Sequence, residues 1–319
     1  MSHRRKYILR CIKLLPLFAV LFFTGCKNSG NSPSTSAPVE VNKASSTRMK
    51  DKYGSLPVTS APGTSTLGND RVSIDVSNVS EGYFYIHYQG DNPKVKMQLT
   101  GPDSITYTYN INTEPACIAV TAGSGSYQVR VFEHISGKNY SVAFSDNFDV
   151  SVTDELKPYL YPNMYVNYSG TSKAVSIAND LAASANSDLE TVASVYHYVA
   201  DNIAYDEAKA ANVESNYLPD IDKVLQAGKG ICFDYAALMA AMLRSQGIPT
   251  RLEIGYSKDA YHAWVSVYIE DIGWIDSIIK FDGNKWTLMD PTLAANANSS
   301  SKVKEYIGDG SNYRTMYSY

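Results

Sequence analysis

The chain has 319 residues, of which 44% are hydrophobic and 19% are charged, and its formal net charge is −4. Lys and Arg do not gather into a stripe, which argues against a nucleic-acid-binding surface. The length and the apolar content are sufficient for two ordinary domains.

The first 26 residues have the three parts of an export signal: a basic start, an apolar run over residues 14–23, and small residues. The apolar run is too short to span a bilayer comfortably, so a cleaved signal peptide is expected. The run Phe23-Thr24-Gly25-Cys26 resembles the lipobox of bacterial lipoproteins, although the family usually has Leu where this chain has Phe23. The resemblance implies lipidation at Cys26 and an extracytoplasmic protein anchored to the cell membrane. The alternative is an ordinary signal peptide and a secreted, soluble protein.

Residues 27–69 are dominated by Ser, Thr, Asn, Gly and Pro, which predicts a disordered tether. If Cys26 is the anchor and Cys11 leaves with the signal, the mature chain keeps Cys117 and Cys232 as free thiols. Two cysteines make no disulfide framework.

Residues 70–153 contain short runs rich in β-branched and aromatic residues, separated by Gly, Pro, Asp and Asn turns. Six or seven strands at near-even spacing predict an antiparallel, Ig-like β-sandwich. Cys117 lies in one of these runs and is expected to be a small buried hydrophobe. His87 and His134 also lie in strands without metal-ligand spacing, and we expect structural roles for both.

After residue 165 the apolar period changes from two to that of a helix. A capping box begins at Ser187, and a second helix is expected from about Cys232 to Gln246, followed by strand-like runs. Helices followed by strands predict an α+β domain over residues 165–319. The chain is thus expected to be multi-domain, with an all-β domain before an α+β domain.

Cys232 follows two glycines and opens the predicted second helix. Unpaired N–H groups and the helix dipole favour a thiolate in the first turn of a helix, which makes a cysteine nucleophilic. The alternative is a buried cysteine with a packing role only.

A nucleophilic cysteine needs a base, and the base needs an acceptor that holds its tautomer. His262 lies in a strand-like run and is expected to project from the face that carries Trp264. Asp290 closes a later strand-like run before Pro291, and it could meet His262 if the two strands pair. Asp276 is a weaker candidate because no Pro-Thr follows it.

The order of cysteine on a helix, histidine on a strand and aspartate at the next strand resembles the transglutaminase-like superfamily, a branch of papain-like cysteine chemistry. The motifs read GKGICFDYAALMAAMLRSQGIPTRLEIGY, YHAWVSVY and WTLMDPT. The resemblance implies that Cys232 is the nucleophile, His262 the general base and acid, and Asp290 the orienting partner.

The resemblance also indicates how the rest of the cleft is built. Trp264 and Trp286 are expected to wall the cleft, and Tyr217 is a candidate for the second oxyanion donor beside the backbone N–H of Cys232. Residues 271–285 depart from the simplest family pattern by inserting a strand pair with a turn at residues 282–284. No cofactor or metal is expected, and no calcium site is recognisable.

The expected function is a cell-surface cysteine enzyme that attacks an amide carbonyl of a peptide or protein and forms a thioester. Water would then give hydrolysis, and a lysine amine would give a cross-link. One alternative is a non-catalytic module that binds a peptide or the cell wall with the same fold. In a third reading, the β domain recognises cell-wall polymer while the C-terminal domain trims wall peptides.

Overall fold

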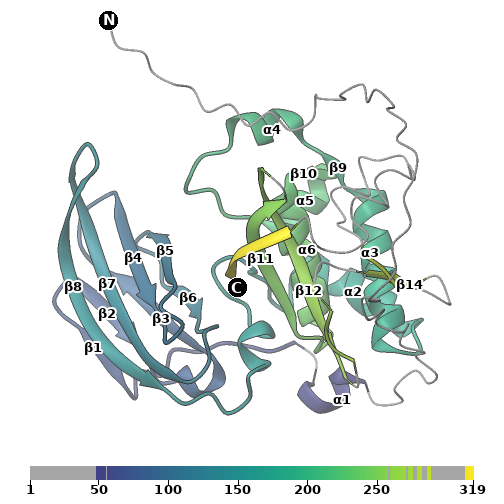
Figure 1. Ribbon diagram of the computed structural model, residues 1–319, viewed down its shortest axis with the longest axis horizontal. Coiled ribbons are helices and arrows are strands. Elements are labelled where there is room, and N and C mark those ends of the chain that lie inside the picture. The colour runs from purple at the N-terminus through teal and green to yellow at the C-terminus, as the bar shows by residue number, and fades with distance from the viewer. Residues whose placement is uncertain are drawn as a thin grey trace, which may run out of the picture.

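The computed structural model describes residues 48–54, 56–257, 259–270, 272–275, 279–281, 286–288 and 313–319, with the segments 279–281 and 286–288 described by their backbone alone. Figure 1 shows two bodies, an N-terminal β domain on one side and a domain of helices and a sheet on the other. Within the described residues, no helix combines the length and the apolar content needed to cross a lipid bilayer.

The N-terminal β domain contains two four-stranded antiparallel sheets, with the orders β1-β2-β3-β6 and β5-β4-β7-β8. Its strands are β1 (Thr66–Gly68), β2 (Val72–Asp75), β3 (Tyr83–Tyr88), β4 (Val95–Thr100), β5 (Thr106–Ile111), β6 (Ala116–Ala119), β7 (Gly125–Ser136) and β8 (Asn139–Val150), with a 3₁₀ turn, η1, at Val79–Glu81. Seven of these strands, β2 to β8, lie within residues 70–153, where the sequence predicted six or seven. The finer assignment to an Ig-like sandwich stays a prediction.

Alternating burial explains why these runs form strands. In β4 every second side chain is buried, so one face of the sheet is apolar and the other faces solvent. The buried faces of the two sheets meet, since the ring of Phe84 in β3 lies 5.4 Å from the ring of Phe148 in β8. Cys117 in β6 is 9% exposed, in agreement with its predicted role as a buried hydrophobe.

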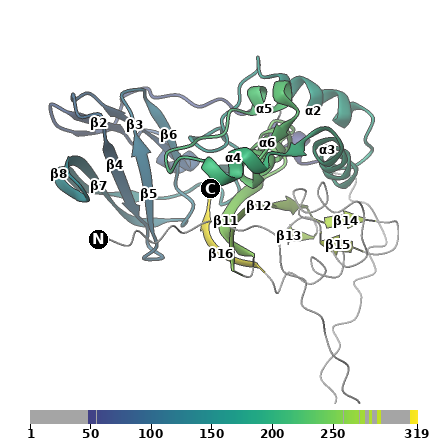
Figure 2. The ribbon, with the colours of Figure 1, turned by 90° about the horizontal axis from the view of Figure 1, so that it is seen from above.

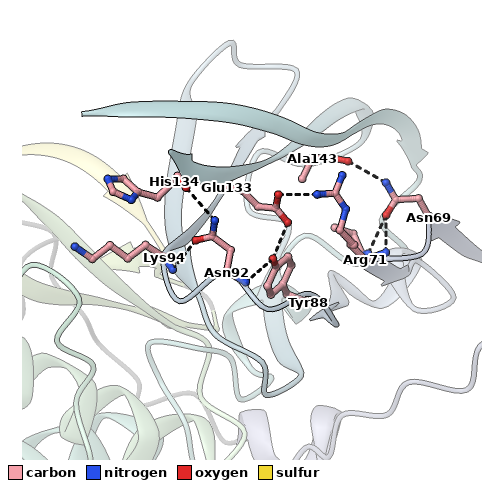
Figure 3. Close-up of polar contacts among 9 residues, drawn as sticks. Asn69, Arg71, Tyr88, Asn92, Lys94, Glu133, His134 and Ala143 are labelled. Atoms are coloured by element: carbon pink, nitrogen blue, oxygen red, sulfur yellow. Dashed lines mark hydrogen bonds and ion pairs between the residues drawn. The ribbon is translucent and has the colours of Figure 1, made fainter. Parts of the chain in front are cut away.

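A polar network joins the two sheets at one end of the β domain (Figure 3). The Glu133 carboxylate accepts hydrogen bonds from Arg71 Nη1 and from the Tyr88 hydroxyl, both at 2.6 Å. Asn92 Nδ2 donates to the His134 carbonyl at 2.9 Å. The two sheets are therefore tied by side-chain hydrogen bonds as well as by apolar contact.

The structure corrects the prediction of a disordered tether for the part of residues 27–69 that it describes. Helix α1 (Met49–Tyr53) and strand β1 both lie inside this segment. Met49 is 1% exposed and its backbone N–H donates to Asp188 Oδ2 at 2.6 Å, while Arg48 Nη2 donates to Thr191 Oγ1 at 2.9 Å. Contacts with the C-terminal domain, rather than local propensity, hold α1 in place.

The C-terminal domain has helices before its main sheet, as predicted. A 3₁₀ turn, η2 (Lys157–Tyr159), precedes it, and its elements are α2 (Lys173–Ala183), α3 (Asp188–Asn202), β9 (Ala204–Tyr205), α4 (Glu207–Asn212), α5 (Ile221–Ala227), β10 (Lys229–Gly230), α6 (Cys232–Arg244), β11 (Thr250–Ser257), β12 (Ala260–Ile269), β13 (Gly273–Ile275), β14 (Ile279–Phe281), β15 (Trp286–Leu288) and β16 (Tyr313–Ser318). The main sheet has the antiparallel order β13-β12-β11-β16.

Helix α6 is the centre of this domain. Every residue from the first turn at Asp234 to Arg244 is buried, and the helix packs against β11 and β12. Half of the predicted capping box forms at the start of α3: Ser187 Oγ accepts from the Glu190 N–H at 3.2 Å, while Glu190 Oε2 accepts from the N–H of Asn186, one residue before the N-cap, at 2.7 Å. The helical period of the sequence is thus confirmed in α3 and α6.

The two domains meet along the β5 and β6 edges of the β domain, as the view in Figure 2 shows. The Met164 N–H donates to the Cys117 carbonyl at 2.9 Å, and the Ser318 N–H donates to the Tyr107 hydroxyl at 3.3 Å. Tyr109 stacks on Tyr165 with ring centroids 5.6 Å apart. The C-terminal strand β16 and the segment that links the domains therefore both contact the β domain.

Candidate active site

A short strand pair and two glycines determine the path of the backbone just before Cys232. β9 and β10 pair in parallel, and Gly228, with φ +62°, turns the chain from α5 into β10. A Cβ at Gly230 would lie 2.6 Å from the Asp234 Cβ, so only glycine allows this close approach. Cys232 is the first residue of α6 and is half-buried. Its thiol therefore lies at the positive end of the helix dipole.

A buried carboxylate supports the start of α6. Asp234 is fully buried and accepts hydrogen bonds from the Ile231 N–H at 2.8 Å, from Lys209 Nζ at 2.6 Å and from the Tyr217 hydroxyl. The network joins α4, the segment before α5 and the first turn of α6. It fixes the backbone on both sides of Cys232.

His262 lies near the beginning of β12 and is half-buried. Its ring packs at 6.3 Å from the Trp264 ring, on the strand face that the sequence predicted, and at 6.4 Å from Tyr313 of β16. Gly255 of β11 is the cross-strand partner of His262. A Cβ at Gly255 would clash with the Arg314 carbonyl and lie 2.9 Å from the Trp264 ring, which explains the glycine there.

Cys232 and His262 line the same cavity, which has a volume of about 380 Å³. The cavity is also lined by residues 213–218, by Tyr165 of the linking segment, and by Thr108 and Asn110 of β5. Volume and lining are typical of small-ligand and substrate sites. The arrangement brings a thiol at a helix start and an imidazole to one solvent-accessible site, as thiol-based acyl transfer requires.

The structure corrects the predicted position of one tryptophan and the predicted donor role of one tyrosine. Trp264 is 1% exposed, and its Nε1 donates to Glu253 Oε2 at 2.7 Å, so it packs in the interior beside His262 rather than walling the cleft. Tyr217 does line the cavity, but its hydroxyl donates to Asp234 and so commits the proton that an oxyanion donor would need.

Other predicted residues lie outside the described part of the chain. These are Asp290 and Cys26, while Trp286 begins β15 and its side chain is not described. Two strands, β13 and β14, lie within the predicted insertion at residues 271–285, and β14 pairs with β15 on the far side of residues 282–284. The sequence allowed Asp290 to meet His262 on the condition that the strand before Asp290 paired with the His262 strand. Among the described strands, β12 pairs with β11 and β13, and β15 pairs with β14, so this condition is not met by direct pairing. The role of Asp290 stays a prediction.

The second free thiol differs from Cys232 in its surroundings. Burial raises the pKa of the Cys117 thiol to about 12, so this group stays protonated at neutral pH. It is therefore an internal reference for the reactivity of Cys232. Among the described residues, no group of three or more His, Cys, Asp or Glu side chains could hold a metal ion.

Sequence reasoning missed two parts of the site. Asp234 at the third position of α6 could have been found as the acidic partner in a helix N-terminal motif. Thr108 and Asn110 of β5 could not have been found in this way, because the local pattern of a strand does not indicate which distant segment its side chains will face.

Comparison with known proteins supports the resemblance. Residues 175–291 match the model of the Transglutaminase-like superfamily, and this range includes Cys232, His262 and Asp290. The chain is 25% identical over 175 residues to human kyphoscoliosis peptidase, covering 49% of this chain and 26% of that protein. It is 25% identical over 167 residues to the protein YebA of Bacillus subtilis, covering 43% of this chain and 22% of that protein. The chain thus spans about a quarter of the length of these relatives.

Solved structures show a partial likeness. The periplasmic domain of TgpA from Pseudomonas aeruginosa has a TM-score of 0.35 at 15% identity, with 76% of this chain and 98% of that chain covered. A protein from Cytophaga hutchinsonii, classed as a cysteine protease, has a TM-score of 0.35 at 14% identity, with 72% and 69% covered. The resemblance to the superfamily rests on the match of residues 175–291 and not on these scores.

Proposed function

We propose that the transglutaminase-like domain, to which residues 175–291 belong, makes this protein a cysteine enzyme that cleaves or transfers amide acyl groups of peptides or proteins. The observation that supports the proposal is that Cys232, at the first position of α6, and His262 of β12 line one cavity. The positive end of the helix dipole stabilises a thiolate at this position.

In the proposed reaction, Cys232 Sγ attacks the carbonyl carbon of an amide while His262 holds the thiol proton. The C–N bond breaks, the proton passes from His262 to the leaving amine or ammonia, and a thioester remains on Cys232. Water or a lysine amine then attacks the thioester carbon while His262 takes its proton. The C–S bond breaks, and the proton passes from His262 to the Cys232 thiolate, which restores the thiol. Hydrolysis and cross-linking differ only in the group that reaches the thioester.

The developing oxyanion needs donors, and the backbone N–H of Cys232 is the proposed first donor because the first N–H groups of a helix have no partner within it. Asp290 is the proposed acceptor that orients the His262 imidazole. Its role is a prediction from the family motif.

The first test is the rate at which iodoacetamide labels each thiol of the purified chain at neutral pH, followed by mass spectrometry. Cys232 should label much faster than Cys117, whose thiol is buried and protonated. His262→Ala should slow labelling of Cys232 and leave Cys117 unchanged. Equal rates for both thiols, or no effect of His262→Ala, would contradict the catalytic proposal and favour a peptide-binding module.

The second test separates the two reaction outcomes. Incorporation of a fluorescent primary amine into dimethylated casein would show transfer, and release of new amino termini or ammonia without amine incorporation would show hydrolysis. Cys232→Ala should abolish whichever activity is found.

The proposal also includes location at the outer face of the bacterial membrane through a lipid on Cys26, with cell-wall peptide as one substrate option. The supporting feature is the match of residues 23–26 to a lipobox. Metabolic labelling with an alkyne fatty acid tests it, because Cys26→Ser should remove the label and release the protein from the membrane fraction. Label that persists on the Cys26→Ser chain would refute the anchor.

A further inference from the structure

Aromatic and aliphatic side chains form much of the lining of the cavity beside Cys232, together with hydroxyl and amide groups. Seven of the side chains that line it are Tyr or Phe, and they come from the segment between the domains, β9, the segment before α5, α6, β12 and the C-terminal strand. Tyr165 packs against Phe233 of α6 at 5.6 Å and against Tyr319 at 4.4 Å. Rings that pack on one another hold the cavity open in a fixed shape.

The lining is nearly without charge. Apart from the His262 imidazole, Glu214 is the one formally charged side chain among the described lining residues, and it is exposed at the rim. Burial raises the pKa of Tyr165 to about 12 and also raises the pKa of Tyr261 and Tyr319. These phenols are therefore neutral at physiological pH, so a charged group would lose hydration on entering and would meet no charged side chain of the described lining other than Glu214 and His262.

One wall of the cavity comes from the N-terminal β domain. Thr108 and Asn110 project from the exposed face of β5, the edge strand of its sheet, and both line the cavity. Asn110 Nδ2 donates to the Ser215 carbonyl at 3.2 Å, which ties β5 to the segment that carries Tyr217. The shape of the cavity therefore depends on both domains.

We infer that this cavity is a subsite for a large apolar or aromatic side chain next to the amide that Cys232 attacks, and that β5 helps to select it. The inference rests on the proposed function for the identity of the reacting amide. The occupant is a peptide or protein segment, because the group that Cys232 attacks in the proposed function is the amide of a peptide or protein. The β domain is then part of the substrate site and not a separate adhesion module.

The test uses three alkylating probes on the purified chain: iodoacetamide, N-phenethyl iodoacetamide and N-(2-carboxyethyl) iodoacetamide. The rate at which each labels Cys232 is normalised to its rate with glutathione, which removes intrinsic reactivity. The phenethyl probe should show saturation and a preference of about tenfold or more over iodoacetamide, as expected when an aromatic ring leaves water for an apolar site. The carboxyethyl probe should show no preference. Equal normalised rates for the phenethyl and carboxyethyl probes would overturn the inference.

A matched pair of variants tests the wall formed by β5. Asn110→Trp should fill the cavity and remove the phenethyl preference, while labelling by the small iodoacetamide is less affected. Asn147→Trp is the control, since Asn147 is also an exposed asparagine on a strand of the same sheet but does not line the cavity. A full preference that survives Asn110→Trp would refute the role of β5.

The labelling experiment distinguishes failure of the proposed function from failure of this inference. If Cys232 labels no faster than an ordinary thiol, the catalytic proposal fails, but the ratio between probes still reports the cavity. For a chain in which Cys232 does not label at all, saturation-transfer NMR on the Cys232→Ala variant compares N-acetylphenylalaninamide with N-acetylaspartate. Transfer to the aromatic compound alone supports the inference, and equal or absent transfer refutes it.

Discussion

Replacing Asp234 by alanine should weaken the fold and the site together. The carboxylate is fully buried, and its loss leaves the Lys209 ammonium, the Tyr217 hydroxyl and the Ile231 N–H without their shared acceptor. Removing one partner of a buried ion pair costs about 3–5 kcal/mol, and we expect about 3 kcal/mol because Lys209 is 28% exposed and can partly return to water. Urea unfolding measures this change.

The same variant should slow iodoacetamide labelling of Cys232, because the Ile231 N–H contact fixes the chain directly before the nucleophile. Lys209→Met should cost at least as much stability as Asp234→Ala, because it leaves the fully buried Asp234 carboxylate without its cation and with only the Tyr217 and Ile231 donors. Lys223→Met is the control, since Lys223 pairs with Asp220 on the surface, and it should change neither measurement. A free energy of unfolding for Asp234→Ala within about 0.5 kcal/mol of the unchanged chain would refute this reasoning, since surface substitutions stay within that range.

Three further predictions follow from packing. Because burial raises the pKa of the Cys117 thiol to about 12, its alkylation should be negligible from pH 7 to 9 in the folded chain and should rise only toward pH 12 or in urea, as mass spectrometry would show. Gly255→Ala should lower the free energy of unfolding by about 1–3 kcal/mol, since the added methyl group would clash with the Arg314 carbonyl. Calorimetry that finds no change would contradict the observed packing of β11 against β16. Met49→Ala should cost about 2 kcal/mol because this side chain is 1% exposed, whereas Val58→Ala at a side chain 75% exposed should cost nothing measurable.

The strands of the β domain and the two long helices of the C-terminal domain could be predicted because their patterns are local. Alternating burial in β4 and the side-chain N-cap at Ser187 both depend on residues that are close together in the sequence. Helix α1 could not be predicted in this way. It has five residues in a Ser- and Pro-rich segment, and its order comes from contacts between Met49 and Asp188, 139 positions apart.

The sequence predicted the reactive residues of the site better than the strands and side chains around them. The helix that begins at Cys232 and the strand that carries His262 followed from local pattern and family motif, and both residues line one cavity. The pairing of β15 with β14 rather than β12 is a choice among strands that local sequence does not determine. The burial of Trp264 followed from Glu253, a polar partner inside the sheet that alternation alone does not reveal.

The chain has 25 tyrosines, and several of them have a physical explanation at the junction of the two domains. Tyr107 and Tyr109 of β5 pack edge-on against Tyr319, with centroids 5.3 and 6.1 Å away, and Tyr165 stacks on Tyr109. A tyrosine ring can be buried against other rings while its hydroxyl reaches a backbone group, as Tyr107 does with Ser318. Rings of this cluster also line the cavity beside Cys232. Substitutions that loosen the junction should therefore change the shape of the cavity as well as the stability of the chain, because one set of side chains forms both.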